Sequence, residues 1–263
     1  MSEEKRKRQI KLTIAYDGTD FCGFQSQENG PSVEEALNAA LSRIAGHKVR
    51  ILAASRTDAG VHAKGQVASF FLTGSIPTEN ICKAVNGLLP SSVAVTAAEE
   101  VPAAFHCRYQ TTGKHYRYTV YNEKQRSPFD ERYSYHYPIP LNLAKIEAAI
   151  PIFLGEHDFE AFTATHSGRN SFVRTLDLIT VNRNGSYVIF DFWGKAFLYK
   201  MVRSITGALI DIGRGFLTAD TVATALTTKN RSLLSLTAPA KGLCLEKIYY
   251  NEEYDIDKAC IMR

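Results

Sequence analysis

The chain has 263 residues, of which 45% are hydrophobic and 22% charged, and its formal net charge is +4 at pH 7. This composition is typical of a globular protein with a large core in one or two domains. No run approaches the roughly 18 consecutive apolar residues of a membrane span, and the first residues lack the apolar core of a secretory signal. We therefore expect a cytoplasmic protein that does not enter the membrane.

The first half of the chain has well-marked elements. Pro31-Ser32 is a helix-start signal, Gly46 is a stop signal, and Leu89-Pro90 closes a second helix. The predicted order is strand 9–16, helix 33–45, strand 48–54, strand 65–72, helix 78–88 and strand 93–99. This βαββαβ order is that of a ferredoxin-like unit.

The second half repeats this order with one helix added. Its predicted elements are strand 114–122, helix 143–154, strands 172–182 and 187–193, helices 200–212 and 219–227, and strand 243–250. We therefore predict an α+β (mixed α/β) fold of two ferredoxin-like halves, residues 1–103 and 104–263. Their sheets are expected to be largely antiparallel around a central cleft, which is a common place for a binding site.

The segment SRTDAGVH at residues 55–62 is the strongest candidate site in the first half. It follows a short apolar strand, so Asp58 is expected on a loop that the sheet beneath holds still. The nearby guanidinium of Arg56 favours an ionised carboxylate, which suits a nucleophile. Arg56 is itself a candidate for RNA contact. The alternative is a turn-capping Asp beside a surface Arg, because Asp before Gly is common in turns.

Basic residues alternate with aromatic residues in the segment that joins the two halves. Cations at Arg108, Lys114 and Arg117 lie among tyrosines at 109, 116 and 118. Such a pattern suits an RNA surface, where cations neutralise phosphates and aromatic rings stack on bases. The alternative is a half-exposed strand with one charged face and one packed face.

No metal or nucleotide-binding motif is predicted. His62 follows Asp58 by four residues, a spacing that would suit a metal pair on a helix, but Ala59-Gly60 predicts a turn there instead. The five cysteines include no CxxC pair, which argues against a zinc site and a disulfide framework. Gly213-Arg214-Gly215 lacks the other residues of a phosphate-binding loop and is predicted to end a helix.

Seven segments, in order along nearly the whole chain, resemble the tRNA pseudouridine synthase A family. They are YDGTDFCGFQSQ (16–27), SRTDAGVHAKGQVASF (55–70), FHCRY (105–109), HYRYTVYN (115–122), RSPF before HYP (126–129 and 136–138), FLYKMVRSITG (197–207) and TAPAKGLCLEKIYY (237–250). Each segment alone is weak, but seven in order are specific. The resemblance implies the pseudouridine synthase fold.

The resemblance also implies the chemistry and the roles of residues. Asp58 would be the catalytic nucleophile, Tyr116 would contact the target uridine, and Arg203 would pair with Asp58. The activity would be isomerisation of uridine to pseudouridine in the anticodon arm of tRNA, at positions 38 to 40, by a homodimer without a cofactor. Two departures are visible: Ser55 replaces a usual Gly, and Leu234-Ser235-Leu236 replaces an Ala-Gly-Pro stretch.

Two other classes of protein stay open as alternatives. A non-catalytic RNA-binding or chaperone module of the same fold would not depend on Asp58. A carbohydrate hydrolase using Asp58 would need a second carboxylate across the scissile bond. Possible partners for it are Asp17, Asp20, Asp191 and Asp211.

Overall fold

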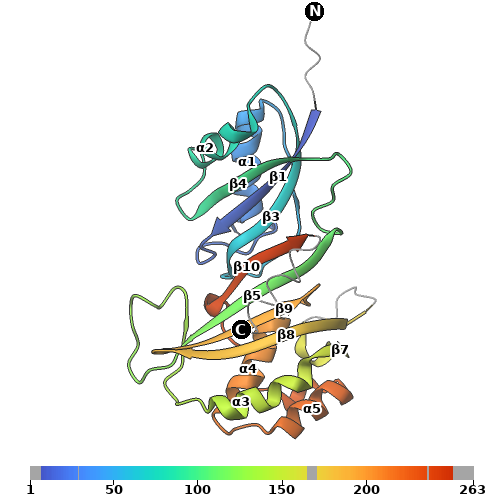
Figure 1. The fold of residues 1–263 in the computed structure, drawn as a ribbon. Coiled ribbons are helices and arrows are strands. Elements are labelled where there is room, and N and C mark those ends of the chain that lie inside the picture. The colour runs from blue at the N-terminus through green and yellow to red at the C-terminus, as the bar shows by residue number, and fades with distance from the viewer. Residues whose placement is uncertain (1–6, 29, 165–170, 236, 251–263) are drawn as a thin grey trace, which may run out of the picture. The chain divides into compact units, whose positions relative to one another are not determined.

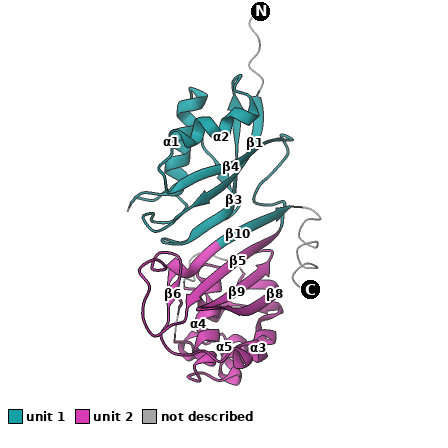
Figure 2. Cartoon of the chain, turned by 60° about the vertical axis from the view of Figure 1, so that its left-hand side comes forward, with its two compact units in different colours: residues 1–112, 245–263 teal, residues 113–244 magenta. Residues whose placement is uncertain are grey.

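The structure is a computed structural model that describes residues 7–28, 30–164, 171–235 and 237–250. Its contacts divide the chain into two compact units, residues 1–112 with 245–263 (unit 1) and residues 113–244 (unit 2), as Figure 2 shows. The division into two halves, residues 1–103 and 104–263, that the sequence analysis proposes stays a prediction.

Unit 1 is built on an antiparallel sheet with two helices along one face (Figure 1). The sheet has the order β4-β1-β3-β10, and β2 also pairs with β3. The strand order β4-β1-β3-β2 is that of a ferredoxin-like unit. The elements are β1 (Lys7–Tyr16), α1 (Val33–Ala45), β2 (Leu52–Ala53), β3 (His62–Thr73), α2 (Thr78–Asn86), β4 (Val93–Val101) and most of β10 (Leu243–Tyr250).

The sequence explains why these elements form where they do. Along β1, every second side chain is buried, from Ile10 to Tyr16, so one face of the strand packs on the core. Helix α1 begins where the side chain of Ser32 accepts a hydrogen bond from the backbone N–H of Glu35. It ends at Gly46, whose φ of 71° is the left-handed conformation that glycine adopts readily.

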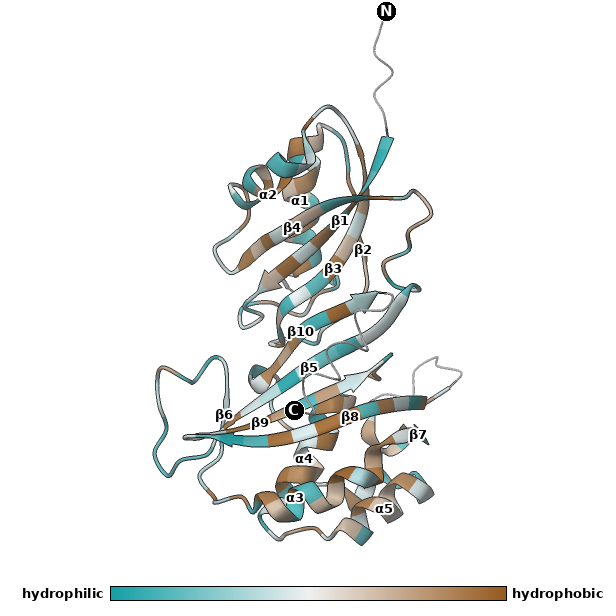
Figure 3. Ribbon diagram, in the orientation of Figure 1, coloured by the Kyte–Doolittle hydropathy of each residue, from teal (hydrophilic) through white to brown (hydrophobic). Residues whose placement is uncertain are grey.

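The strands of unit 2 pair antiparallel in the order β5-β9-β8-β7, and the short β6 runs parallel to β5. Figure 3 shows the strongly apolar helix α4, in which all residues except Arg203 are buried. The elements are β5 (Thr111–Tyr121), β6 (Tyr135–His136), α3 (Leu143–Ala149), η1 (Ile150–Phe153), β7 (Gly155–Asp158), η2 (Glu160–Phe162), β8 (Val173–Asn184), β9 (Tyr187–Gly194), α4 (Met201–Gly213), α5 (Ala219–Thr228), η3 (Arg231–Leu233) and η4 (Ala240–Gly242).

The α+β class with largely antiparallel sheets is confirmed, but two predicted elements are wrong in extent. The predicted strand 48–54 shortens to β2, because side chains of α1 take its backbone donors: Val49 N donates to the hydroxyl of Ser42 and Ile51 N to the amide oxygen of Asn38. The predicted helix 143–154 ends as α3 and continues as the 3₁₀ turn η1, which contains Pro151. Proline lacks the N–H that a longer α-helix would need there.

The sequence did not predict the short strands β6 and β7 of unit 2. Each has only two to four residues, too few for a periodic pattern. Across the described ranges, no helix is long and apolar enough to cross a membrane.

Candidate active site

The loop that carries Asp58 is held within unit 1 by a closed turn. The backbone N–H of Val61 donates to the carbonyl of Asp58 at 3.1 Å, and Gly60 has a φ of 75°, which glycine tolerates. Just before the turn, the hydroxyls of Thr57 and Tyr16 are hydrogen-bonded at 2.7 Å in a buried position. Asp58 is therefore held on one side by the buried hydrogen bond between Thr57 and Tyr16, at the end of β1, and on the other side by the turn that Val61 closes.

A second segment, distant in sequence, braces the same loop. The backbone N–H of Phe24 donates to the carbonyl of Thr57 at 3.1 Å, and that of Gly60 donates to the carbonyl of Phe21 at 3.4 Å. Gly23 has a φ of 106°, and a side chain there would place its Cβ 3.0 Å from the carbonyl oxygen of Thr57. The first two family-like segments, 16–27 and 55–70, are thus in backbone contact.

A polar cluster around the buried side chain of His62 lies at the end of the Asp58 turn. His62, the first residue of β3, accepts at Nδ1 a hydrogen bond from the backbone N–H of Gly18 at 3.1 Å. The same nitrogen lies 3.2 Å from a carboxylate oxygen of Asp17, which also accepts from the backbone N–H of Thr19. Sequence reasoning gave neither Asp17 nor His62 this bracing role, although both lie in family-like segments.

The two predicted site residues of unit 1 differ in exposure. Arg56 is exposed, whereas Asp58 is partly buried. In the part of the chain that the structure describes, no group of three His, Cys, Asp or Glu side chains could hold a metal ion. His62 makes its contacts with the 17–19 segment instead.

Tyr116 lies on β5 in the core of unit 2. Its side chain is 6% exposed and meets the ring of Phe197 edge-on, with 5.0 Å between ring centroids. Tyr118, two residues along, points to the same face, because side chains alternate on a strand. Tyr118 is fully buried and donates its hydroxyl hydrogen to the carbonyl of Pro239 at 2.8 Å.

Arg203 lies in the first turn of α4 and is tied to the segment that precedes β10. Its Nε donates to the carbonyl of Ala238 at 2.7 Å, and the backbone N–H of Ala238 donates to the carbonyl of Arg203 at 3.0 Å. Burial raises the pKa of Tyr118, and the positive charge of Arg203 counteracts this in part. Unit 2 therefore brings the segments of Tyr116, Arg203 and Ala238 around Tyr118.

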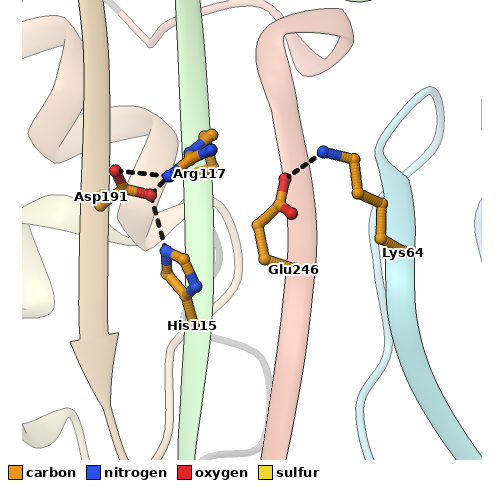
Figure 4. A network of polar contacts seen from close by, with 5 residues as sticks. All are labelled: Lys64, His115, Arg117, Asp191 and Glu246. Atoms are coloured by element: carbon orange, nitrogen blue, oxygen red, sulfur yellow. Dashed lines mark hydrogen bonds and ion pairs between the residues drawn. The ribbon is translucent and has the colours of Figure 1, made fainter. Parts of the chain in front are cut away.

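The basic and aromatic strand from residue 114 has one packed face and one charged, partly exposed face. Tyr116 is buried, and on the opposite face His115 and Arg117 bind the carboxylate of Asp191 on β9 at 2.6 and 2.8 Å (Figure 4). Burial raises the pKa of Asp191, but the hydrogen bonds from His115 and Arg117 outweigh it and hold that pKa below its usual value. The indole of Trp193 stacks on His115 at 4.3 Å.

Asp191 therefore has a structural role in unit 2. It was one of the carboxylates that a carbohydrate hydrolase could have used, and its oxygens are taken by His115 and Arg117 instead. Asp211 is likewise fully buried and binds the guanidinium of Arg214 at 2.7 Å.

Comparison with known proteins agrees with the fold and the order of segments. The family model described as tRNA pseudouridine synthase matches residues 12–110 and 149–251. The tRNA pseudouridine synthase A of Clostridium kluyveri is 40% identical over 92% of this chain and 100% of its own length. That of Moorella thermoacetica is 41% identical over 92% of this chain and 99% of its own length.

A more distant similarity is to the solved structure titled "Crystal Structure of a Cbf5-Nop10-Gar1 Complex". It has a TM-score of 0.35 and 14% identity, and covers 76% of this chain and 45% of that one, which is too little to carry an argument.

The fold and the ordered segments are those of a pseudouridine synthase, an isomerase that converts uridine to pseudouridine. The chain belongs to the tRNA pseudouridine synthase family.

Proposed function

We propose that this isomerase modifies uridines in the anticodon arm of tRNA, at positions 38 to 40. The tRNA substrate follows from family membership, because relatives at about 40% identity over nearly the whole chain are named tRNA pseudouridine synthase A. The seven ordered segments in the sequence support the finer assignment to the anticodon arm. A uridine in a stem must also leave the base stack, at a cost of a few kcal/mol that binding contacts offset.

The reaction is balanced without any other reactant. The bond between C1′ and N1 breaks and a bond between C1′ and C5 forms, while C5 loses a proton and N1 gains one. No electrons are exchanged with another molecule, so we expect no cofactor.

We propose Asp58 as the catalytic nucleophile. Three routes are open to one carboxylate: attack at C1′, attack on the uracil ring, or stabilisation of positive charge at C1′ while the base leaves. The proposal is supported by the hydrogen bonds that hold the backbone on both sides of Asp58. Thr57 on one side is hydrogen-bonded to Tyr16, and Val61 on the other side closes the turn. A carboxylate fixed in this way loses little entropy when it reaches the reacting atom.

We propose that Tyr116 stacks on the uracil and that Arg203 pairs with Asp58 and keeps it ionised. The ring of Tyr116 is held edge-on by Phe197, which restricts its rotation. The side chain of Arg203 is oriented through its bond to Ala238. A phenol is a poor base at neutral pH, so the proposal gives Tyr116 the stacking role and leaves open which group removes the C5 proton. Arg56, which is exposed on the Asp58 loop, is proposed to contact the RNA backbone.

We also propose a homodimer that works in the cytoplasm, as the family resemblance implies. Light scattering at working concentration measures the oligomeric state. A monomer under those conditions would contradict this part of the proposal.

Tritium release tests the proposed function. In tRNA labelled at C5 of uridine, each isomerisation frees one label to water. We expect release by the wild type and by Asp220→Asn, an exposed carboxylate in the first turn of α5, but none by Asp58→Asn. Equal release by Asp58→Asn would overturn the role of Asp58. No release by the wild type on several unmodified tRNAs would overturn the tRNA proposal and favour a non-catalytic RNA-binding module.

A further inference from the structure

The loop 105–110 of unit 1 presents a stacked pair of rings to solvent. The rings of His106 and Tyr109 lie 4.1 Å apart at an angle of 25°, and Tyr109 is 76% exposed. Arg108, between them in sequence, is also exposed. We call His106, Arg108 and Tyr109 the aromatic platform. A single exposed aromatic side chain is ordinary on a protein surface; what distinguishes this loop is that two rings stack on each other with an exposed cation beside them.

The platform is held in shape by its own loop. The ring nitrogen Nδ1 of His106 accepts hydrogen bonds from the backbone N–H groups of Arg108 and Tyr109, both at 3.3 Å. The backbone N–H of His106 donates to the side-chain oxygen of Gln110, and the backbone N–H of Gln110 donates back to the carbonyl of His106. The rings are therefore arranged before any partner arrives, which lowers the entropy cost of binding.

Alternate residues of the same loop are anchored in unit 1. Cys107 is fully buried, its thiol donates to the carbonyl of Leu52 at 3.0 Å, and its carbonyl accepts from the hydroxyl of Tyr250 at 2.6 Å. Burial raises the pKa of Tyr250 far above its usual value, so this hydroxyl stays a donor at physiological pH. The carbonyl of Phe105 accepts from the side chain of Gln9 at 2.7 Å. The anchors hold the loop to β1 and β10, while the platform faces outward.

The chemistry of the platform fits a nucleic acid base with a free face. A flat ring supported by a second ring offers a stacking surface, and stacking is tolerant of base identity. The guanidinium of Arg108 can neutralise a phosphate beside that base. Both features require a base that is not already covered on that face, such as one in a loop or at the end of a helix.

We infer that the aromatic platform binds an unpaired base of the substrate RNA, other than the reacting uridine, with Arg108 on an adjacent phosphate. This inference rests on the proposed function, because it takes the substrate to be RNA. It adds a positioning contact on unit 1, separate from the loop of Asp58.

Binding of tRNA to an inactive background tests the platform without depending on turnover. In the Asp58→Asn protein, Tyr109→Ala should raise the dissociation constant for unmodified tRNA about ten-fold, as loss of one stacked base does. Tyr109→Phe should bind as tightly as the parent, because the ring is kept. Phe216→Ala is the matched control, since Phe216 is 60% exposed and also has a cation, Arg214, over its ring.

Salt dependence separates the roles of the ring and the cation. Arg108→Ala should lower the slope of log affinity against log salt by about one, as loss of one phosphate contact does, whereas Tyr109→Ala should leave that slope unchanged. In the active protein, Tyr109→Ala should lower kcat/KM through KM. Circular dichroism and thermal unfolding verify that each variant is folded.

Equal affinity of Tyr109→Ala and Phe216→Ala for tRNA would overturn the inference. A change in sedimentation of Tyr109→Ala without RNA would also overturn it, because the platform would then be a contact with a second copy of the chain. Failure of tritium release by the wild type, with the binding loss still present, would overturn the proposed function and leave the platform as an RNA contact.

Discussion

Arg203 and Ala238 hold each other through two hydrogen bonds of opposite direction. The side chain of Arg203 donates to the carbonyl of Ala238, and the backbone N–H of Ala238 donates to the carbonyl of Arg203. Ala238 is fully buried. The direction of the guanidinium is therefore fixed by backbone atoms at a point where α4 meets the segment before β10.

This arrangement predicts that lysine cannot replace Arg203. Lysine keeps the charge, but its ammonium is a single point on a flexible stem and lacks the planar fork. Arg203→Lys should lower single-turnover formation of pseudouridine by about ten- to a hundred-fold, equivalent to roughly 1.4 to 2.7 kcal/mol. Arg183→Lys, an exposed arginine on β8, is the control and should react at the wild-type rate. Full activity of Arg203→Lys would show that charge alone suffices.

Gly18 should tolerate no side chain. A Cβ there would lie 2.1 Å from the backbone carbonyl oxygen of Val61, which belongs to the Asp58 turn. Because backbone atoms cannot swing away, Gly18→Ala should displace the turn, cost about 1–3 kcal/mol of stability and lower turnover. Gly74→Ala meets nothing within 4 Å and should change neither quantity. Urea unfolding and tritium release measure the two effects. Wild-type values for Gly18→Ala would contradict the described packing of the two loops.

Ser235, at a position where this chain departs from the family pattern, donates its hydroxyl hydrogen to the buried carboxylate of Asp211. Ser235→Ala removes one hydrogen bond from a carboxylate that Arg214 still binds. We expect a loss of about 0.5–1.5 kcal/mol in the free energy of unfolding. Ser232→Ala, which removes an exposed bond to Asn230, is the control and should cost less. Equal costs for the two variants would mean that the Ser235 bond adds no stability.

Acid should weaken unit 2 through Asp191. The pKa of this carboxyl is lower in the folded protein than in the unfolded chain, so its contribution to stability is complete above about pH 4 and is lost as pH falls further. Asp191→Asn should cost about 1–3 kcal/mol near neutral pH. That cost should shrink below about pH 4. Urea unfolding of the wild type and of Asp191→Asn at several pH values gives the difference in their free energies of unfolding. The effects of the other carboxyl groups on stability are the same in both proteins and cancel in this difference. A cost that is independent of pH would contradict the ionised contact drawn in Figure 4.

Much of the fold could be predicted from local sequence signals. Ser32 and Gly46 mark the ends of α1 as predicted, and β10 spans the predicted range 243–250. The strand 48–54 was predicted too long because Val49 and Ile51 are buried like strand residues. Their backbone donors bind side chains of α1, a tertiary choice that alternation of apolar residues does not reveal.

The site could be predicted only where residues are neighbours in sequence or share a family-like segment. The motif located Asp58, but no spacing rule indicates that Phe21 and Phe24 would reach the backbone of its loop. The basic and aromatic pattern did not distinguish Tyr109, which is open to solvent, from Tyr116, which is buried. Exposure depends on the register of β5 and on the partner Asp191, which comes from a strand far along the chain.

Unit 1 combines residues 1–112 with the last strand, whereas unit 2 is one continuous stretch. The returning strand is integral to unit 1: Lys64 binds Glu246 at 3.0 Å, and a Cβ at Gly65 would lie 2.4 Å from the carbonyl oxygen of Glu246. Synthesis on the ribosome proceeds from the N-terminus, and domains fold as their residues emerge. The second unit can therefore fold first, while the unit that carries Asp58 waits for the final strand. A ribosome that stalls before residue 243 would release a chain in which the loop of Asp58 lacks a finished scaffold.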